Sequence, residues 1–171
     1  MPQYRMKNIC LIVVSAFLLS ACMGQKAAEP VVSQRVQVEA PIEALGQDEI
    51  LSKIGRLPAQ ELGDNECGLF LWLRREDVPL VFFQHSDGRA YMAVDGTVHL
   101  LERTMAEEPV GLQYYRKQVF AASDLTVSVA VAPEAAPSLP KGLKVPNGTI
   151  SLEVDGGWAA ALPVAGLIGC K

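Results

Sequence analysis

Hydrophobic and polar residues alternate along much of the second half of the chain. In residues 125–131, four Leu or Val residues alternate with Thr, Ser and Ala. A period of two places successive side chains on opposite faces of a β-strand, so this segment predicts a strand with one buried face. The same period predicts further strands at 67–74, 78–84, 89–94, 97–102, 113–121, 150–154 and 158–162.

Turn signals separate these segments. Asp87-Gly88 and Asp95-Gly96 lie between strand-like runs, and this dipeptide is a preferred two-residue hairpin turn. Asn147-Gly148 and Asp155-Gly156-Gly157 predict two more turns. The sequence therefore predicts a meander of about seven or eight antiparallel strands.

Two stretches interrupt the alternation. Glu107, Glu108 and Pro109 break the pattern after the strand predicted at 97–102. Residues 133–146 hold four prolines and predict a long surface loop.

One short helix is predicted ahead of the strands, at residues 48–54. Ile50, Leu51 and Ile54 would share one face, Asp48 would cap the N-terminus, and the glycine that follows would end the helix. The predicted fold class is all-β with one short N-terminal helix. A small antiparallel β-sandwich and a small barrel both satisfy this pattern.

The beginning of the chain follows a different pattern. Arg5 and Lys7 precede an uncharged apolar run from Ile9 to Leu19, which is the arrangement of a signal peptide. Eleven residues of helix rise only about 16 Å, roughly half of a hydrocarbon core, so a permanent membrane span is not expected. An ordinary secretory signal, cleaved after a small residue, is one interpretation.

The apolar run ends in Leu19-Ser20-Ala21-Cys22, which resembles the lipobox of bacterial lipoproteins. This resemblance implies that Cys22 receives a thioether-linked diacylglycerol, that residues 1–21 are removed, and that the new amino terminus is acylated. Each buried methylene contributes about 0.8 kcal/mol, so two or three acyl chains would hold the protein on a membrane. Met23 follows in place of the Asp that often marks inner-membrane retention, which favours the outer membrane, facing the periplasm.

Composition and charge bound the rest of the chain. Residues 22–47, rich in Ala, Pro, Gln, Val and Glu, predict a flexible tether, and residues 48–171 predict a β-rich globular domain. Loss of residues 1–21 removes two cations and changes the net charge from −4 to −6. An acidic body argues against nucleic acid as a partner. The expected partners are the membrane, through the lipid on Cys22, and an unknown protein or cell-wall component.

Two cysteines remain after Cys10 is removed and Cys22 is lipidated. In an oxidising compartment, Cys67 and Cys170 predict one disulfide, which would close the domain through a loop of 103 residues. A redox pair would more often be two residues apart, and a metal site would need more ligands than two histidines add. No cofactor or metal is therefore expected.

The motifs that suggest catalysis have simpler interpretations. His85, Ser86 and Asp87 are the residue types of a hydrolase triad, but they are adjacent in one turn and cannot converge as a relay. His99 together with His85 provides too few ligands for a closed zinc site. No catalytic, cofactor-binding or metal-binding residue is assigned.

A surface patch on one predicted strand is the candidate partner site. Tyr114 and Arg116 would share one strand face, where they could stack against a sugar or pair with an acidic partner. Arg74-Arg75 is a second group of neighbouring cations. A solvated strand face without a partner is the alternative.

The sequence favours a non-catalytic envelope lipoprotein that binds a periplasmic or cell-wall partner. One alternative is a lysozyme-inhibitor-like protein, since the lipobox, the small β-domain and a Cys near each end are similar to membrane-bound inhibitors of C-type lysozyme. Ser86 to Tyr91 echoes the Ser-Gly and Tyr of that family's inhibitory segment, but no Trp-x-Lys-Gly follows. The other alternative is an enzyme acting on envelope polymers, in which distant carboxylates such as Glu66, Asp87 and Glu153 would have to meet.

Overall fold

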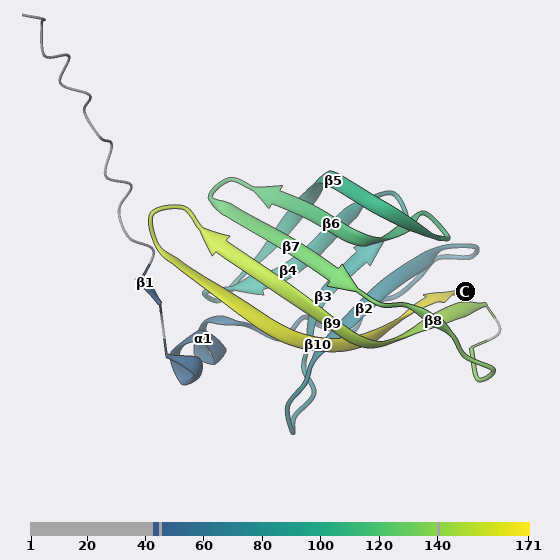
Figure 1. Cartoon of the computed structure of the whole chain (residues 1–171), viewed down its shortest axis with the longest axis horizontal. Coiled ribbons are helices and arrows are strands. Elements are labelled where there is room, and N and C mark those ends of the chain that lie inside the picture. The colour runs from purple at the N-terminus through teal and green to yellow at the C-terminus, as the bar shows by residue number, and fades with distance from the viewer. Residues whose placement is uncertain (1–42, 45, 140) are drawn as a thin grey trace, which may run out of the picture. The chain divides into compact units, whose positions relative to one another are not determined.

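The structure, a computed structural model, describes residues 43–44, 46–139 and 141–171 (Figure 1). The predicted signal peptide, Cys22 and the predicted tether up to residue 42 lie outside the described residues. The described residues belong to one compact unit. Its elements are β1 (Glu43–Ala44), α1 (Gln47–Lys53), β2 (Cys67–Leu73), β3 (Leu80–His85), β4 (Arg89–Val94), β5 (Thr97–Gly111), β6 (Tyr114–Ala122), β7 (Leu125–Val131), β8 (Glu134–Ala135), β9 (Gly142–Val154) and β10 (Trp158–Cys170).

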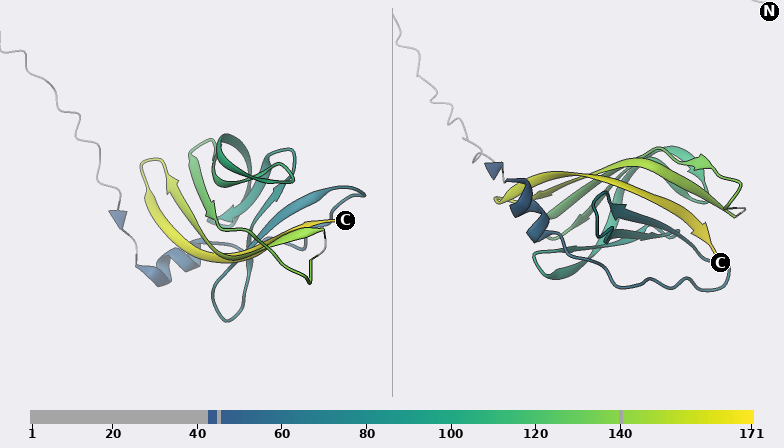
Figure 2. Two further views of the ribbon diagram at one scale, coloured as in Figure 1. Left: turned by 45° about the vertical axis from the view of Figure 1, so that its right-hand side comes forward. Right: turned by 90° about the horizontal axis from the view of Figure 1, so that it is seen from below.

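Eight of these strands close into an antiparallel barrel. Strands β2 to β7 pair in sequence, β7 pairs with β9, β9 pairs with β10, and β10 returns to pair with β2. Figure 2 shows the strong curvature of the sheet that this closure requires. The predicted all-β fold with one short helix is confirmed, and the barrel is the architecture that forms.

The predicted disulfide is also confirmed. Cys67 and Cys170 are register partners on β2 and β10, with Cα atoms 4.0 Å apart and a sequence separation of 103. The bridge therefore joins the first and last barrel strands, at the seam where the barrel closes.

The barrel interior is filled by the inward faces of the strands, as the two-residue period requires. Leu69, Leu71 and Leu73 of β2 are buried inside, whereas Phe70 and Trp72 point outward and are half-buried. These aromatic rings join a second apolar cluster outside β2, β3 and β4, which the segment after α1 covers. Strand β2 is therefore covered by apolar side chains on both faces.

Helix α1 differs from the prediction at its N-terminus. It spans Gln47–Lys53, its N-cap is Gly46, and no side chain caps it, so the prediction of Asp48 as N-cap was wrong. Asp48 lies in the first turn, where its charge favours the helix dipole. The predicted apolar face is confirmed, because Ile54 is buried and α1 packs against the barrel core. Among the described residues, no helix has the length and apolar character needed to cross a membrane.

The Asp-Gly turns form as predicted, since their conformation depends on local residues. Asp95 and Gly96 both have positive φ, at 48° and 78°, which is the geometry of a type I′ hairpin turn. Gly88, with φ of 97°, ends the turn that His85 begins through a backbone hydrogen bond.

The predicted break at Glu107, Glu108 and Pro109 was wrong. Strand β5 continues through these residues to Gly111, with register shifts on either side. Pairing of β4 with β5 ends at Glu102, and no described strand pairs with the outer edge of the remainder of β5. A proline is tolerated there because an edge position does not need its missing N–H.

The predicted turn at Asn147-Gly148 was also wrong. Both residues lie inside β9, where Gly148 pairs with Val131 on one side and Val164 on the other. A Cβ atom on Gly148 would approach both neighbouring strands to within about 3.2 Å. Glycine therefore serves close strand packing here. The predicted long loop at 133–146 is correspondingly shorter, because β8 and the start of β9 occupy part of it.

Candidate functional site

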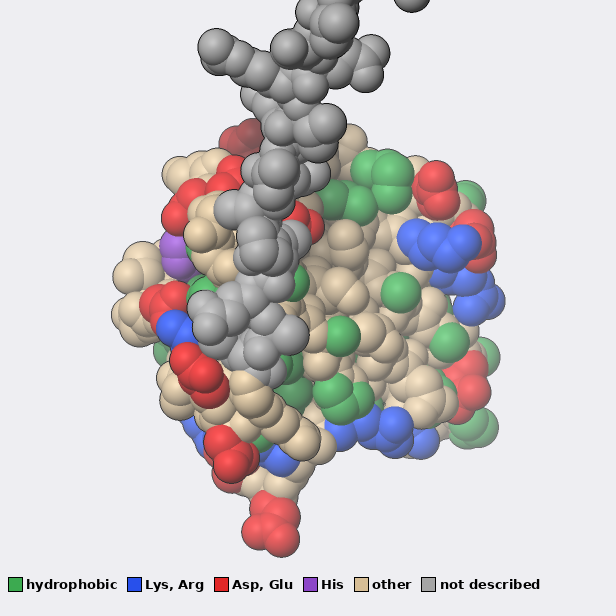
Figure 3. Space-filling view, turned by 60° about the vertical axis from the view of Figure 1, so that its left-hand side comes forward, with side chains coloured by type: hydrophobic (Ala, Val, Ile, Leu, Met, Phe, Trp, Pro, Cys, Tyr) green, Lys and Arg blue, Asp and Glu red, His purple; other side chains and the backbone are tan. Residues whose placement is uncertain are grey.

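A groove of about 540 Å³ crosses the outer surface of the barrel over β6, β7 and β9. One row of outward-facing residues crosses its floor, in which Thr149 pairs with Ala130 and Ala130 pairs with Lys117. Short side chains in the middle of this row leave the backbone surface accessible. Figure 3 shows a face with little charge at its centre, with Lys and Arg side chains at its lower margin and at its right-hand margin, where Asp and Glu side chains lie beside them.

Three cations line the groove. Arg74 follows β2 on one side, and Arg116 and Lys117 belong to β6 on the other. Arg74 is oriented by Asn147, whose side-chain oxygen accepts a hydrogen bond from Nη1 at 2.9 Å. The groove therefore has a fixed guanidinium at one side and two cations at the other.

Glu108 is the one carboxylate of the groove lining. Its Oε1 lies 2.7 Å from Nζ of Lys117. This hydrogen bond lowers the pKa of the Glu108 carboxyl below its ordinary value and raises the pKa of the Lys117 ammonium. Both groups stay ionised near neutral pH, so three cations outnumber one carboxylate.

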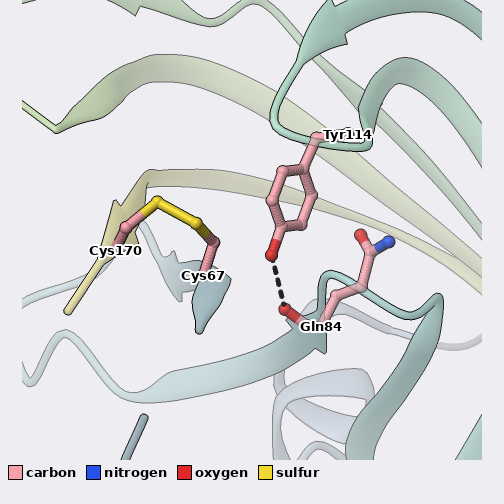
Figure 4. Close-up of a disulfide and its surroundings, with 4 residues drawn as sticks. All are labelled: Cys67, Gln84, Tyr114 and Cys170. Carbon is pink, nitrogen blue, oxygen red and sulfur yellow. Dashed lines mark hydrogen bonds between the residues drawn. A yellow bond between two sulfur atoms is a disulfide. The ribbon is translucent and has the colours of Figure 1, made fainter. Parts of the chain in front are cut away.

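The predicted patch of Tyr114 and Arg116 does not form. Tyr114 is completely buried at one end of the barrel interior, whereas Arg116 is exposed in the groove. In Figure 4 the Tyr114 ring points down beside the disulfide, and its hydroxyl donates a hydrogen bond of 3.4 Å to the carbonyl oxygen of Gln84. Burial raises the pKa of the Tyr114 phenol far above its ordinary value.

The predicted patch fails because of the geometry at the N-terminal end of β6. Tyr114 and Gln118 both point inward, and strict alternation would place Arg116 with them. Pairing of β6 with β7 begins only at Lys117, so the first residues of β6 extend beyond the wall that β7 completes. Alternation along an isolated strand cannot show where the neighbouring strand stops.

The other residues considered from sequence do not converge. Asp87 binds Arg89, with Nε to Oδ2 at 2.7 Å, and His85 stacks edge-on to Phe83. Glu66 accepts a hydrogen bond from the backbone of its own turn. Glu153 is on β9 next to the β9–β10 turn, at the opposite end of the strands from the β3–β4 turn that holds Asp87.

The sequence offers two histidines as potential metal ligands, which are too few for a closed site. Within the described part of the chain, no group of three or more His, Cys, Asp or Glu side chains is placed to hold a metal ion. The described groove is lined instead by three cations, one carboxylate, one amide and mostly small side chains.

Sequence reasoning missed two features of the groove. Asn147 was predicted in a turn, yet it orients Arg74 from within β9. Arg74 and Arg116 were noticed as separate cations, and no local pattern indicates that barrel closure brings them to one groove. The required signal is the strand order, which places β9 and β10 between β7 and β2.

Comparison with protein families, with curated proteins and with solved structures found no match to this chain. The chemistry of the groove follows from its side chains. Guanidinium and ammonium groups donate charge-assisted hydrogen bonds to carboxylates and phosphates, and a floor of short side chains lets an extended chain approach. The arrangement suits recognition of an anionic partner.

Proposed function

We propose that this protein is a non-catalytic envelope lipoprotein, held on the membrane by lipid on Cys22, whose barrel binds an acidic periplasmic or cell-wall partner. The observation that supports binding is the groove, in which Arg74, Arg116 and Lys117 surround a floor of small side chains. The chain as a whole carries a net charge of −4, so this local excess of cations departs from the average surface. Such a patch steers and orients an oppositely charged partner.

The proposed partner chemistry is a set of carboxylates on an extended chain. Acidic protein segments and the short peptides of the cell wall both present such groups. Exposed charge pairs contribute modestly, about 0.2 to 1 kcal/mol each, so several contacts together would give a salt-sensitive interaction.

Binding can be tested with residues 39–171, which form a compact unit. Sedimentation with purified cell-wall sacculi, and crosslinking in envelope extracts, would be compared between the parent and the double variant Arg74→Glu with Arg116→Glu. We expect roughly tenfold weaker binding because two attractive contacts become repulsive. The control is Lys141→Glu with Lys144→Glu, which makes the same charge change at exposed lysines outside the groove. Equal losses in both double variants would contradict a role for the groove.

Anchoring is tested separately in the full chain. Radiolabelled palmitate should enter the parent and not the Cys22→Ala variant, and only the parent should remain with the membrane fraction. Failure of the parent to incorporate palmitate would refute the anchor and leave the binding experiment valid.

A further inference from the structure

A second cavity lies beneath α1. It has a volume of about 300 Å³, and its walls include Ile50 and Leu51 from the helix and Leu73, Leu162 and Pro163 from the barrel. This volume is at the lower end of the range for small-ligand sites and is large enough for one apolar side chain. The two arginines that follow β2 also line it.

The cavity lies at an interruption in the strand pairing. On one side of β10, β1 pairs with Trp158 and Ala159, and β2 pairs with residues 164–170. Between them, β10 keeps β9 as its partner on one side and has no described strand on the other. The carbonyl oxygen of Pro163 accepts a hydrogen bond from the backbone N–H of Arg74, so only residues 160–162 of the described chain present an unpaired β10 edge beside the cavity. Such a short edge can pair with an added extended segment.

The cavity and the basic groove adjoin. Arg74 lines both of them. Pro163 lines the cavity, and its register partner Thr149 lines the groove. A chain lying in the groove would reach the cavity across this single residue pair.

The guanidinium groups give the cavity entrance a positive charge. Arg75 forms a bidentate ion pair with Asp77, which holds the pKa of that carboxyl below its ordinary value. Arg74 has a neutral partner, the Asn147 amide, and keeps its full charge for a ligand. Charge complementarity therefore favours an occupant that carries an acid beside its apolar group.

We infer that the groove and the cavity form one site for an extended acidic peptide segment, whose carboxylates lie in the groove and whose single apolar side chain enters the cavity beneath α1. This inference rests on the proposed function and adds the anchor residue to it. The apolar anchor supplies affinity, and the cations supply orientation and selectivity for acid.

The experiment uses residues 39–171 and two fluorescent peptides. One is a short glutamate-rich peptide that ends in leucine, and the other is the same peptide with serine in place of the leucine. We expect the leucine peptide to bind about ten- to a hundredfold more tightly, which is the range expected for burying a leucine side chain. Ala161→Leu, which fills the cavity from β10, should abolish this difference between the two peptides.

The matched control is Ala159→Leu, two residues earlier on the same face of β10 and outside the cavity lining. A second variant from the opposite wall, the uncharged Leu51→Asn, must also remove the preference for the leucine peptide, which separates loss of the apolar cavity from a local disturbance of β10. Circular dichroism of each variant establishes that it is folded.

The possible outcomes distinguish the inferred apolar contact in the cavity from the proposed binding function of the groove. If the parent binds both peptides with equal affinity and Arg116→Glu binds both more weakly, the apolar side-chain contact in the cavity is overturned and the proposed function is kept. If neither peptide binds, and the groove variants leave retention on sacculi unchanged, both the inferred cavity contact and the proposed function are overturned. Concentration-dependent dimerisation that Ala161→Leu removes would show that a second copy fills the cavity and would also overturn the inference.

Discussion

Two buried glutamines form the polar part of the barrel interior. The side-chain amides of Gln84 and Gln118 donate hydrogen bonds to each other, at 2.9 and 3.0 Å, and Arg103 donates a further one to Gln118 at 3.2 Å. Such a pair is stable inside a barrel because each amide satisfies the other, whereas a single unpaired amide would cost about 1 to 3 kcal/mol. Tyr114 closes the same end of the barrel above them.

Tyr114 gives the barrel a specific sensitivity to alkaline pH. Burial, and the negative charge of Asp87, raise the pKa of its phenol well above the ordinary value of 10.0. Above about pH 10 the unfolded chain loses this proton while the folded chain keeps it, so the free energy of unfolding falls as the pH rises further. Below that pH the phenol is protonated in both states and adds no pH dependence.

The measurement is urea unfolding of the parent and of Tyr114→Phe at about pH 8 and at about pH 11. At the lower pH the variant loses only the hydrogen bond to Gln84, about 0.5 to 1.5 kcal/mol. At the higher pH the gap should close or reverse, because the variant has no phenol to ionise. A constant gap at both pH values would contradict a raised pKa for Tyr114.

Individual strands and turns follow local rules to different degrees. The hairpin at Asp95-Gly96 and the strand at 125–131 were predicted with correct bounds because their turn residues and alternation are sufficient. The predictions at Pro109 and at Asn147-Gly148 were wrong because the local sequence is not sufficient to fix the conformation there. Their conformation is set by what lies beside them, an unpaired strand edge in the first case and two close neighbouring strands in the second.

Gly166 lies where β10 closely approaches β2. It pairs with Leu71, next to a register shift between Val164 and Gly166 on the β9 side, and a Cβ atom there would lie 1.9 Å from the carbonyl oxygen of Phe70. Gly166→Ala should therefore lower the free energy of unfolding by at least about 2 kcal/mol, because two backbones must separate. Thermal unfolding measures the loss. Gly46→Ala, where the added methyl group meets nothing within 4 Å, is the control and should change stability by less than about 1 kcal/mol.

At the scale of the whole molecule, the order of the strands determines where the site lies. An alternating pattern indicates which side chains share a face of a strand, and it predicted the barrel as one of two architectures. It contains no information on the return of β10 to β2, which brings Arg74 to Asn147 and to the cations of β6. The sequence therefore predicted only the residue types of the candidate site. The location of the site depends on closure of the barrel.

The disulfide secures this closure, and its removal should lower the stability of the fold. It joins strands that are 103 residues apart in sequence, so on the chain-entropy model its loss should cost about 4 to 5 kcal/mol through the greater freedom of the unfolded chain. Urea unfolding of residues 39–171 with Cys67→Ser and Cys170→Ser, compared with the parent, measures this loss.

The folded state should change little in the same variant, because β2 and β10 remain paired along seven register positions and the groove lies away from the bridge. The circular dichroism spectrum and the affinity of the groove are therefore expected to match the parent at low denaturant. A large fall in groove affinity without a fall in stability would mean that the bridge shapes the folded barrel. A fall in stability alone would place its effect in the unfolded chain, where loop entropy acts.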